Sequence, residues 1–395
     1  MTLKVAVLGL TSNKNIGDYL LVESTKYLLR NYSETLRIKD VDVDPRDLKD
    51  YQGLAFLGLK IHSAMRKAES AVFKLVKSPY LRYLYQYAYW YFRLNSHFKK
   101  TLTGVDAIIF SGGGFIKFRT QGLNYLDEQI LKIARKRQIP VMMNAVGVEG
   151  YDENDVRCQN LKKALNFENV RVITTRDDVD TLAGHYVNRE NLVTARVADP
   201  VLYLNAMLGN PTNKAKNVVG INLINPENFR SYGGRLDVNS VTNFYKNLIV
   251  ELRKRGQAFE LFSNGMAADM RFGEKLIEDL NLPKELLLPA PTTSKEFIEL
   301  LRRYRIILAS RMHAGISASA IGIPVVGMIW GEKIEMFSKI ANVRKYYFDE
   351  SELDAKNMAE LLSGGKVLPL REKDVQQLKE STKEYLFAFL DGLSK

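Results

Sequence analysis

Hydrophobic positions in this chain fall into short apolar runs that alternate with segments of helical periodicity. The run KVAVLGL near the start leads through a polar turn, TSNKNIGD, into YLLVESTKYLLR, whose apolar residues have helical spacing. Continuous apolar runs predict strands buried on both faces of a parallel sheet. A strand that leads through a loop into a helix is the repeating unit of doubly wound α/β domains.

The same rhythm occurs in both halves of the chain. Its strand-like runs are VDAIIF, IPVMMNAVG, VRVITTRD and LVTARVADPVL, and then VVGINLI, FELFSN, RIILAS and IPVVGM. Because 395 residues exceed the usual size of one core, we predict two Rossmann-like domains that face a central cleft. They span residues 1–210 and 211–365 with a linker at Asn210–Asn217, and residues 366–395 form a helix that packs back across the junction.

One stretch, from about residue 53 to 100, interrupts this rhythm and is rich in aromatic and basic residues. Between Lys60 and Lys100 there are nine Lys or Arg and one acid, Glu69, within a chain of net charge +12. We predict a helical insertion in the first domain. Its composition suits a membrane interface or a lipid-linked diphosphate, or a pair of helices packed on the first domain or on a second subunit. Nucleic-acid binding is disfavoured, since no such motif is present.

Two absences in the sequence limit the class of protein. The single cysteine, Cys158, excludes a disulfide framework and multi-cysteine metal sites. No run of about 18 apolar residues occurs. We therefore expect a cytoplasmic protein, with peripheral contact at the inner face of the membrane as an option. No metal-ligand cluster stands out, so we expect metal-independent chemistry without a cofactor.

In doubly wound sheets, ligands bind at the carboxyl ends of the strands. The first such loop contains Asn15, Gly17 and Asp18. It reads either as an Asx turn with a helix cap or as a site in which Asp18 is a base and Asn15 holds a hydroxyl. The second loop, with Gly112, Gly113 and Gly114, is either a tight turn or a ligand contact made through unobstructed backbone N–H groups.

Two further loops carry cations. Arg176 ends the run VRVITT and is suited either to clamp an anion or to pair with Asp177 or Asp178. Ser310, Arg311 and His313 follow a buried strand and open a helix of small residues, which favours anion binding at that helix N-terminus. Lys333 follows the next strand and either reaches an anion or lies on the surface.

These loops, in this order, resemble the polysaccharide pyruvyl transferase family. The matching pieces are NIGD, SGGG, TRDD, ADPVL and SRMHAGISASAIGIPVVGMIWGEK. The resemblance implies a fold similar to GT-B glycosyltransferases, with phosphoenolpyruvate as donor and a sugar or lipid-linked glycan as acceptor. It implies that the second domain and Arg176 hold the donor, through Ser310, Arg311, His313 and Lys333. The Asn15–Asp18 and Gly112–Gly114 loops would face the acceptor in the first domain.

The expected product is a pyruvate ketal on two sugar hydroxyls, formed with release of phosphate. We expect His313 as general acid, Arg311 in the anion clamp and Asp18 as base. Two other functions stay open: a nucleotide-sugar glycosyltransferase of GT-B type, and a non-catalytic scaffold at a membrane surface. Self-association into a homo-oligomer is also open.

Overall fold

The computed structural model describes residues 2–12, 15–45, 54–117, 122–209, 216–231 and 234–393. The chain divides into two compact units, the first with residues 1–12, 21–199 and 380–395, and the second with residues 13–20 and 200–379. The predicted boundary at 210/211 therefore lies later than the division at 199/200, and most of the predicted linker, residues 210–215, lies outside the described residues.

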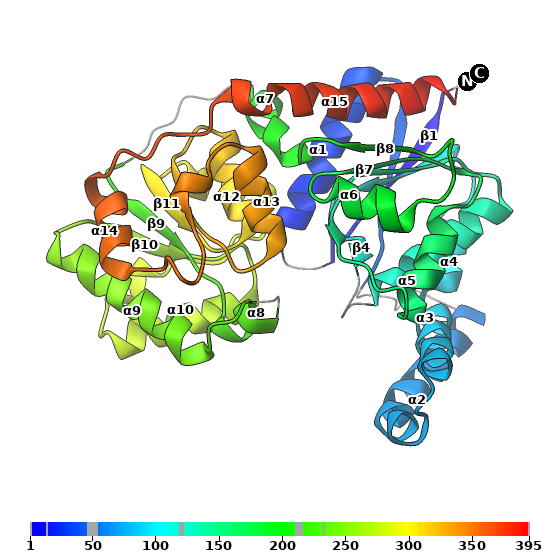
Figure 1. The fold of residues 1–395 in the computed structure, drawn as a ribbon, viewed down its shortest axis with the longest axis horizontal. Helices are drawn as coiled ribbons and strands as arrows, with labels where there is room; N and C mark the ends of the chain where they lie inside the picture. Colours follow the sequence, from blue (N-terminus) through cyan, green and yellow to red (C-terminus); the bar gives the residue numbers. More distant parts are fainter. Residues whose placement is uncertain are drawn as a thin grey trace. The chain divides into compact units, whose positions relative to one another are not determined.

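The first unit is built on a parallel sheet with the strand order β2-β1-β3-β5-β7-β8 (Figure 1). Its strands are β1 (Lys4–Gly9), β2 (Arg37–Asp42), β3 (Ala107–Ser111), β5 (Val141–Val146), β7 (Val170–Thr175) and β8 (Val193–Arg196). A small second sheet pairs β4 (Ile116–Lys117) with β6 (Val148–Glu149). The central strands are buried on both faces, which explains their continuous apolar runs.

The helices of the first unit cover both faces of this sheet. They are α1 (Ile16–Tyr32) from Leu21 onward, α4 (Leu123–Lys136), α5 (Val156–Leu165) and the short α6 (Val179–Thr181), which continues as a π-helical turn at Leu182–Tyr186. The C-terminal helix α15 (Glu372–Asp391) belongs to this unit from Glu380 onward. There the Thr382 hydroxyl accepts a hydrogen bond from the Ala198 amide at 3.0 Å.

The basic segment forms a helical hairpin of α2 (Leu54–Leu75) and α3 (Pro79–Thr101). Figure 1 shows the hairpin extending from the first unit beside α4 and α5. Ser78 caps α3 through its hydroxyl and Pro79 follows at the first helical position, a favoured start for a helix. Within the described residues, no helix has both the length and the apolar character that crossing a membrane requires.

The second unit has a parallel sheet with the order β10-β9-β11-β12-β13. Its strands are β9 (Val219–Asn222), β10 (Phe259–Phe262), β11 (Ile306–Ala309), β12 (Val325–Met328) and β13 (Tyr347–Phe348). Its helices are α7 (Leu204–Met207), α8 (Pro226–Ser231), α9 (Val238–Lys254), α10 (Ala267–Asp279), α11 (Ser294–Leu301), α12 (Met312–Ala320), α13 (Glu332–Ile340) and α14 (Ala355–Gly364). Short 3-10 turns occupy Pro200–Tyr203, Lys284–Leu286 and Arg344–Tyr346. The predicted α/β class, with two doubly wound sheets and a helical insertion, is confirmed.

Candidate active site

The junction of β11 and α12 is the centre of the candidate site. Arg311 has extended backbone angles and is the N-cap of α12, but its side chain does not cap the helix. The helix lies close to the sheet because its residues are small: a Cβ on Gly315 would come within 2.9 Å of the Tyr347 hydroxyl. The N-terminus of α12 therefore lies at the carboxyl edge of the second sheet, where backbone N–H groups and the helix dipole attract anions.

Ser310 joins this junction to its neighbours through two hydrogen bonds. Its hydroxyl lies 2.6 Å from the Tyr245 hydroxyl, and its carbonyl accepts a hydrogen bond from the Trp330 indole at 2.5 Å. Ser310 is fully buried. The Ser310 hydroxyl thus faces Tyr245 inside the second unit, and its contact with the donor stays a prediction.

Arg311 is held in place by a buried carboxylate. Its Nε and Nη2 donate to Oδ2 and Oδ1 of Asp269 at 2.9 and 2.7 Å, a two-pronged pair with planar geometry. The Asp269 side chain is 0% exposed and that of Arg311 is 12% exposed. Asp269 also accepts a hydrogen bond from the Asn225 amide. A cation fixed in this way keeps its position whether or not an anion is bound.

A chain of asparagine amides continues the edge beside Arg311. The side-chain Oδ1 of Asn222 accepts a hydrogen bond from the backbone amide of Arg311 at 2.9 Å, and its Nδ2 donates to Asn264 Oδ1 at 2.9 Å. Asn264 is 1% exposed. Its Nδ2 is buried and has no hydrogen-bond partner among the described residues. A buried donor without a partner is uncommon in proteins. Asn264 is hydrogen-bonded to Asn222, and Asn222 in turn accepts from the Arg311 amide.

The loop at the start of the chain joins this same unit. The Ile16 amide donates to the Asn264 carbonyl at 2.9 Å, and Asn15 Nδ2 donates to Asp18 Oδ2 at 3.1 Å. Gly17 lies against the His313 ring, since a Cβ there would come within 2.5 Å of Nδ1. The structure therefore brings Asn15, Gly17 and Asp18 together with His313, whereas the sequence placed them in different domains.

Two other predicted residues of this unit have clear surroundings. His313 is 8% exposed, on the first turn of α12. Lys333 is the second residue of α13, and its ammonium group lies 5.4 Å from the centre of the Trp330 ring, in cation–π range. Because Trp330 is also bonded to the Ser310 carbonyl, Lys333 is linked through one side chain to the β11–α12 junction.

Arg176 belongs to the first unit and is also ion-paired. Its Nη1 donates to Asp199 Oδ2 at 2.5 Å, and both side chains are buried. The next residue, Asp177, accepts at one oxygen from the Val148 amide, the Asp178 amide and the Thr175 hydroxyl. Burial raises the pKa of the Asp177 carboxyl despite these bonds and the nearby Arg176 charge. Asp178 caps α6 through the Thr181 amide.

The triple-glycine loop follows β3 in the first unit. Gly112 and Gly113 have φ values of 58° and 79°, a left-handed conformation that favours glycine. A Cβ on Gly112 would come within 2.6 Å of the Leu21 side chain, and one on Gly114 within 2.3 Å of Lys117. The loop thus has a structural reason for its glycines, and contact with an acceptor stays a prediction.

Sequence reasoning missed three residues of the site: Asn222, Asn264 and Asp269. The asparagines stand at or just after the ends of strands, in GIN and FSN, which is the signal that could have marked them. Asp269 sits inside a helix and carried no such signal. Among the described residues, no three His, Cys, Asp or Glu side chains form a group suited to a metal ion, and the expectation of metal-independent chemistry stays a prediction.

Solved structures define the class of fold. The chain resembles UDP-GlcNAc 2-epimerase from Neisseria meningitidis with a TM-score of 0.54 and 11% identity, covering 99% of this chain and 100% of that one. A putative UDP-N-acetylglucosamine 2-epimerase from Listeria monocytogenes gives a TM-score of 0.55 and 11% identity, covering 98% of this chain and 97% of that one. The UDP-GlcNAc 2-epimerase from Methanocaldococcus jannaschii gives a TM-score of 0.53 and 9% identity, covering 98% of this chain and 100% of that one. The fold is GT-B-like, and at these identities the likeness concerns the fold alone.

The family comes from the sequence itself. The model of the polysaccharide pyruvyl transferase family matches residues 15–332, most of the chain. No curated protein matches. This chain belongs to the polysaccharide pyruvyl transferase family, and the match begins at the Asn15 loop and ends at the start of α13, so both parts of the candidate site lie inside it.

Proposed function

We propose that this protein transfers pyruvate from phosphoenolpyruvate onto two hydroxyls of a sugar in a polysaccharide or lipid-linked glycan precursor. The product is a ketal, and inorganic phosphate is released. Family membership supports an enzyme of polysaccharide modification. The observation that carries the finer proposal is the cation Arg311, fixed by Asp269 at the N-terminus of α12 beside His313.

The donor requires strong anion binding, since phosphoenolpyruvate carries up to about three negative charges near neutral pH. The N-terminus of α12 supplies a helix dipole, Arg311 supplies a fixed charge, and the buried Asn264 amide supplies a further donor. We assign the phosphate and carboxylate to this edge. Contact of Arg176 and Lys333 with the donor rests on the family resemblance.

The reaction needs a proton at the methylene carbon of the donor. That proton leaves cationic character at C2, which a sugar hydroxyl attacks while giving up its own proton. The C2–O bond to phosphate then breaks, and the second hydroxyl adds at C2 and loses its proton. We assign the acid role to His313 and the base role to Asp18, which the Asn15 amide orients at 3.1 Å.

The direct test is acceptor-dependent phosphate release from phosphoenolpyruvate, with His313→Ala beside the wild type. We expect release only with a suitable glycoside, and loss of at least about 100-fold in the variant. Binding of phosphoenolpyruvate and of a UDP-sugar is measured on the same samples. Binding of the UDP-sugar alone would replace the proposal with a glycosyltransferase. Binding of neither donor, with no phosphate release from any acceptor, would leave a non-catalytic scaffold.

The α2–α3 hairpin supports a proposal of peripheral membrane contact at the cytoplasmic face. Leu75, Tyr80 and Leu81 are 82%, 56% and 52% exposed, and Lys74 and Lys77 lie between or beside them. Exposed apolar and basic side chains together favour an anionic membrane surface. Co-sedimentation with vesicles of anionic and of zwitterionic lipid tests this. We expect binding to the anionic vesicles that weakens with salt, and absence of binding at low salt would remove the proposal.

A further inference from the structure

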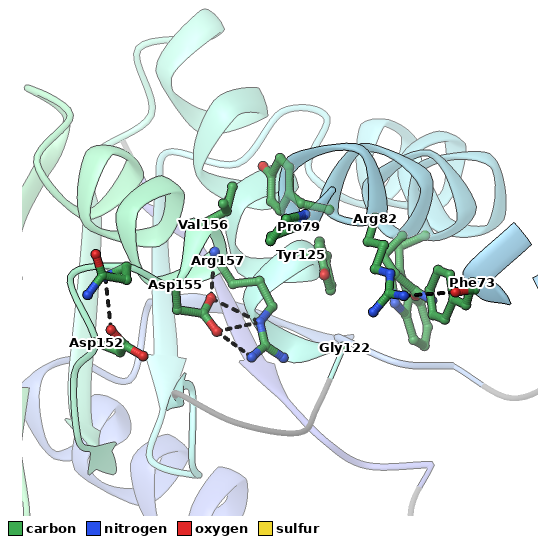
Figure 2. A pocket seen from close by; sticks show the side chains of 13 residues that line it. Phe73, Pro79, Arg82, Gly122, Tyr125, Asp152, Asp155, Val156 and Arg157 are labelled. Atoms are coloured by element: carbon green, nitrogen blue, oxygen red, sulfur yellow. Dashed lines mark hydrogen bonds and ion pairs between the residues drawn. The ribbon is translucent and has the colours of Figure 1, made fainter. Parts of the chain in front are cut away.

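The first unit contains a hollow of about 590 Å³ along helix α3, toward the turn that joins it to α2. This volume lies within the range of about 300–1,000 Å³ that is typical of small-molecule sites. The hollow is lined by the end of α2, one face of α3 and the starts of α4 and α5 (Figure 2). Because α4 follows β3 and α5 follows β5, the hollow lies at the carboxyl edge of the first sheet, the usual place for ligands in this fold.

Helix α3 contributes a stripe of five residues to the wall. Their spacing of three, four, seven and eleven positions from the first member is that of a single helix face: Pro79, Arg82, Tyr83, Gln86 and Trp90. Most other large side chains of this helix point elsewhere, and several of them are exposed. The aromatic residues of this helix are therefore divided between the exposed surface and the wall of the hollow.

The aromatic side of the hollow is held rigidly. Tyr83 donates to Glu128 Oε2 at 2.5 Å, and its ring lies 5.6 Å from the ring of Tyr125. The Trp90 indole lies directly against the backbone of Gly122, since a Cβ there would come within 2.3 Å of the ring. Burial raises the pKa of Tyr125 to about 12, so its hydroxyl stays neutral near pH 7.

The facing side is polar and comes from the loop before α5. Asp155 caps α5 and receives Nε and Nη2 of Arg157 at distances between 2.5 and 3.2 Å. Burial would raise the pKa of the Asp155 carboxyl, but the Arg157 hydrogen bonds outweigh it and lower the pKa. Figure 2 shows this pair on one side of the hollow and the contact of Arg82 with Phe73 on the other.

The charges of the lining identify the ligand class. Arg82 and Arg157 are balanced by Asp152 and Asp155, so the hollow has no net attraction for a phosphate or diphosphate. Aromatic rings together with hydrogen-bonding amides and carboxylates in the lining suit a molecule with an apolar C–H face and a rim of hydroxyls. A pyranose has this structure: its C–H groups contact the electron-rich face of a ring, and its hydroxyls bond to the polar side chains.

We propose that this hollow binds an uncharged pyranose unit of the acceptor glycan, between Trp90 and Tyr125 on one side and Asn154 and Asp152 on the other. That this pyranose belongs to the acceptor rests on the proposed function. Binding of a pyranose in the hollow is independent of the transfer reaction, so it can be tested without phosphoenolpyruvate.

The first experiment is a fluorescence titration with methyl glycopyranosides of glucose, galactose, mannose and N-acetylmannosamine. The chain has only two tryptophans, Trp90 in the hollow and Trp330 in the second unit. We expect a saturable change in emission with at least one glycoside, kept in Trp330→Phe and lost in Trp90→Phe. A change that persists in Trp90→Phe, or no change with any glycoside, would overturn the proposal.

The second experiment measures the KM for the acceptor in the transfer reaction. We expect Asn154→Ala, at an exposed position, to raise this KM about tenfold, as for the loss of one hydrogen bond. Trp90→Ala should raise it further. The KM for phosphoenolpyruvate should not change. The matched control is Lys67→Ala, which lies exposed on α2 and does not line the hollow.

The outcomes separate the two proposals. Glycoside binding at Trp90 without any transfer would refute the proposed function and leave the hollow as a sugar site. Transfer with an acceptor KM that is equal in wild type, Asn154→Ala and Trp90→Ala would overturn the role of the hollow and leave the function intact.

Discussion

The two units carry the same motif at corresponding places, with different consequences. In each, an arginine lies within two residues of the end of a strand inside the sheet and pairs with a buried aspartate: Arg176 with Asp199, and Arg311 with Asp269. Helix α12 begins two residues after β11, and the side chain of its N-cap residue, Arg311, makes no capping hydrogen bond. After β7 it meets two aspartates, of which Asp178 caps a helix of only three residues.

This difference bears on the proposal that the β11 edge receives the donor anion. At the β7 edge the carboxylate of Asp177 accepts hydrogen bonds from the amides of Val148 and Asp178, and its charge repels another anion. At the β11 edge the helix dipole and the Arg311 charge act in the same direction. Two similar ion pairs are therefore expected to attract different partners, because the backbone next to each one differs.

The largest effect is expected for Arg311→Met. Loss of the fixed cation should lower kcat/KM for phosphoenolpyruvate on the order of 1,000-fold. It should also lower the free energy of unfolding by about 3–5 kcal/mol, since Asp269 is left buried without its partner. Phosphate release and denaturant unfolding measure the two effects. Adding Asp269→Leu should restore stability and not activity; a double variant with wild-type activity would show that Arg311 has no role in chemistry.

A smaller catalytic effect is expected for Arg176→Met. The stability cost should again be about 3–5 kcal/mol, but kcat/KM should fall only about 10- to 100-fold, as for one hydrogen bond to a charged group. The double variant with Asp199→Leu separates the two contributions. Hydrogen exchange of residues 170–199 and 306–320 would locate the loss of stability in the first unit. A larger catalytic loss than in Arg311→Met would reverse the comparison.

Gly17→Ala tests the contact between Gly17 and the His313 ring in the second unit. The new methyl group would displace the His313 ring, which lies within 2.6 Å of its position. We expect kcat to fall about 100-fold, as for an acid moved by roughly 1 Å, with phosphoenolpyruvate binding much less affected. Gly364→Ala is the control, since nothing lies within 4 Å of a Cβ there. Equal kcat in both variants would argue against His313 as the acid.

The smallest effect concerns the Asp177 carboxyl. Its pKa is raised by burial, so the folded state binds its proton more tightly than the unfolded state. Ionisation therefore costs stability at neutral pH, and this cost disappears as the pH falls below the pKa of the folded state. We expect Asp177→Asn to be more stable than wild type at pH 7 and to lose this advantage toward pH 4. Unfolding curves across this range measure it, and an advantage that grows on acidification would contradict it.

Much of the fold was predictable because buried parallel strands have continuous apolar runs. The runs VDAIIF and RIILAS became β3 and β11, and the small-residue segment after Arg311 became α12. Strand β2 was missed because it lies at an edge and alternates charged with apolar residues, RIKDVD. LVTARVADPVL was only partly a strand, since β8 ends at Arg196 and a 3-10 turn begins at Pro200.

The candidate site was less predictable than the fold. Arg311 and His313 were marked by their place after a buried strand. Their partners were not, because Asp269 lies inside α10 and Gly17 is about 300 residues away along the chain. The hollow could not be predicted either: the aromatic residues of α3 could be sorted into wall and surface only once the helix was placed against α4 and α5.

The division of the chain has a consequence for its synthesis. Residues 13–20, made early, belong to the second unit, and residues from Glu380 onward belong to the first. Neither unit is therefore complete while most of the polypeptide is still being translated, a period on the order of 20–80 s at about 5–20 residues per second. All strands of the first sheet have been made once Arg196 is added, but the nascent chain must hold that sheet without α15 until residues from Glu380 onward follow.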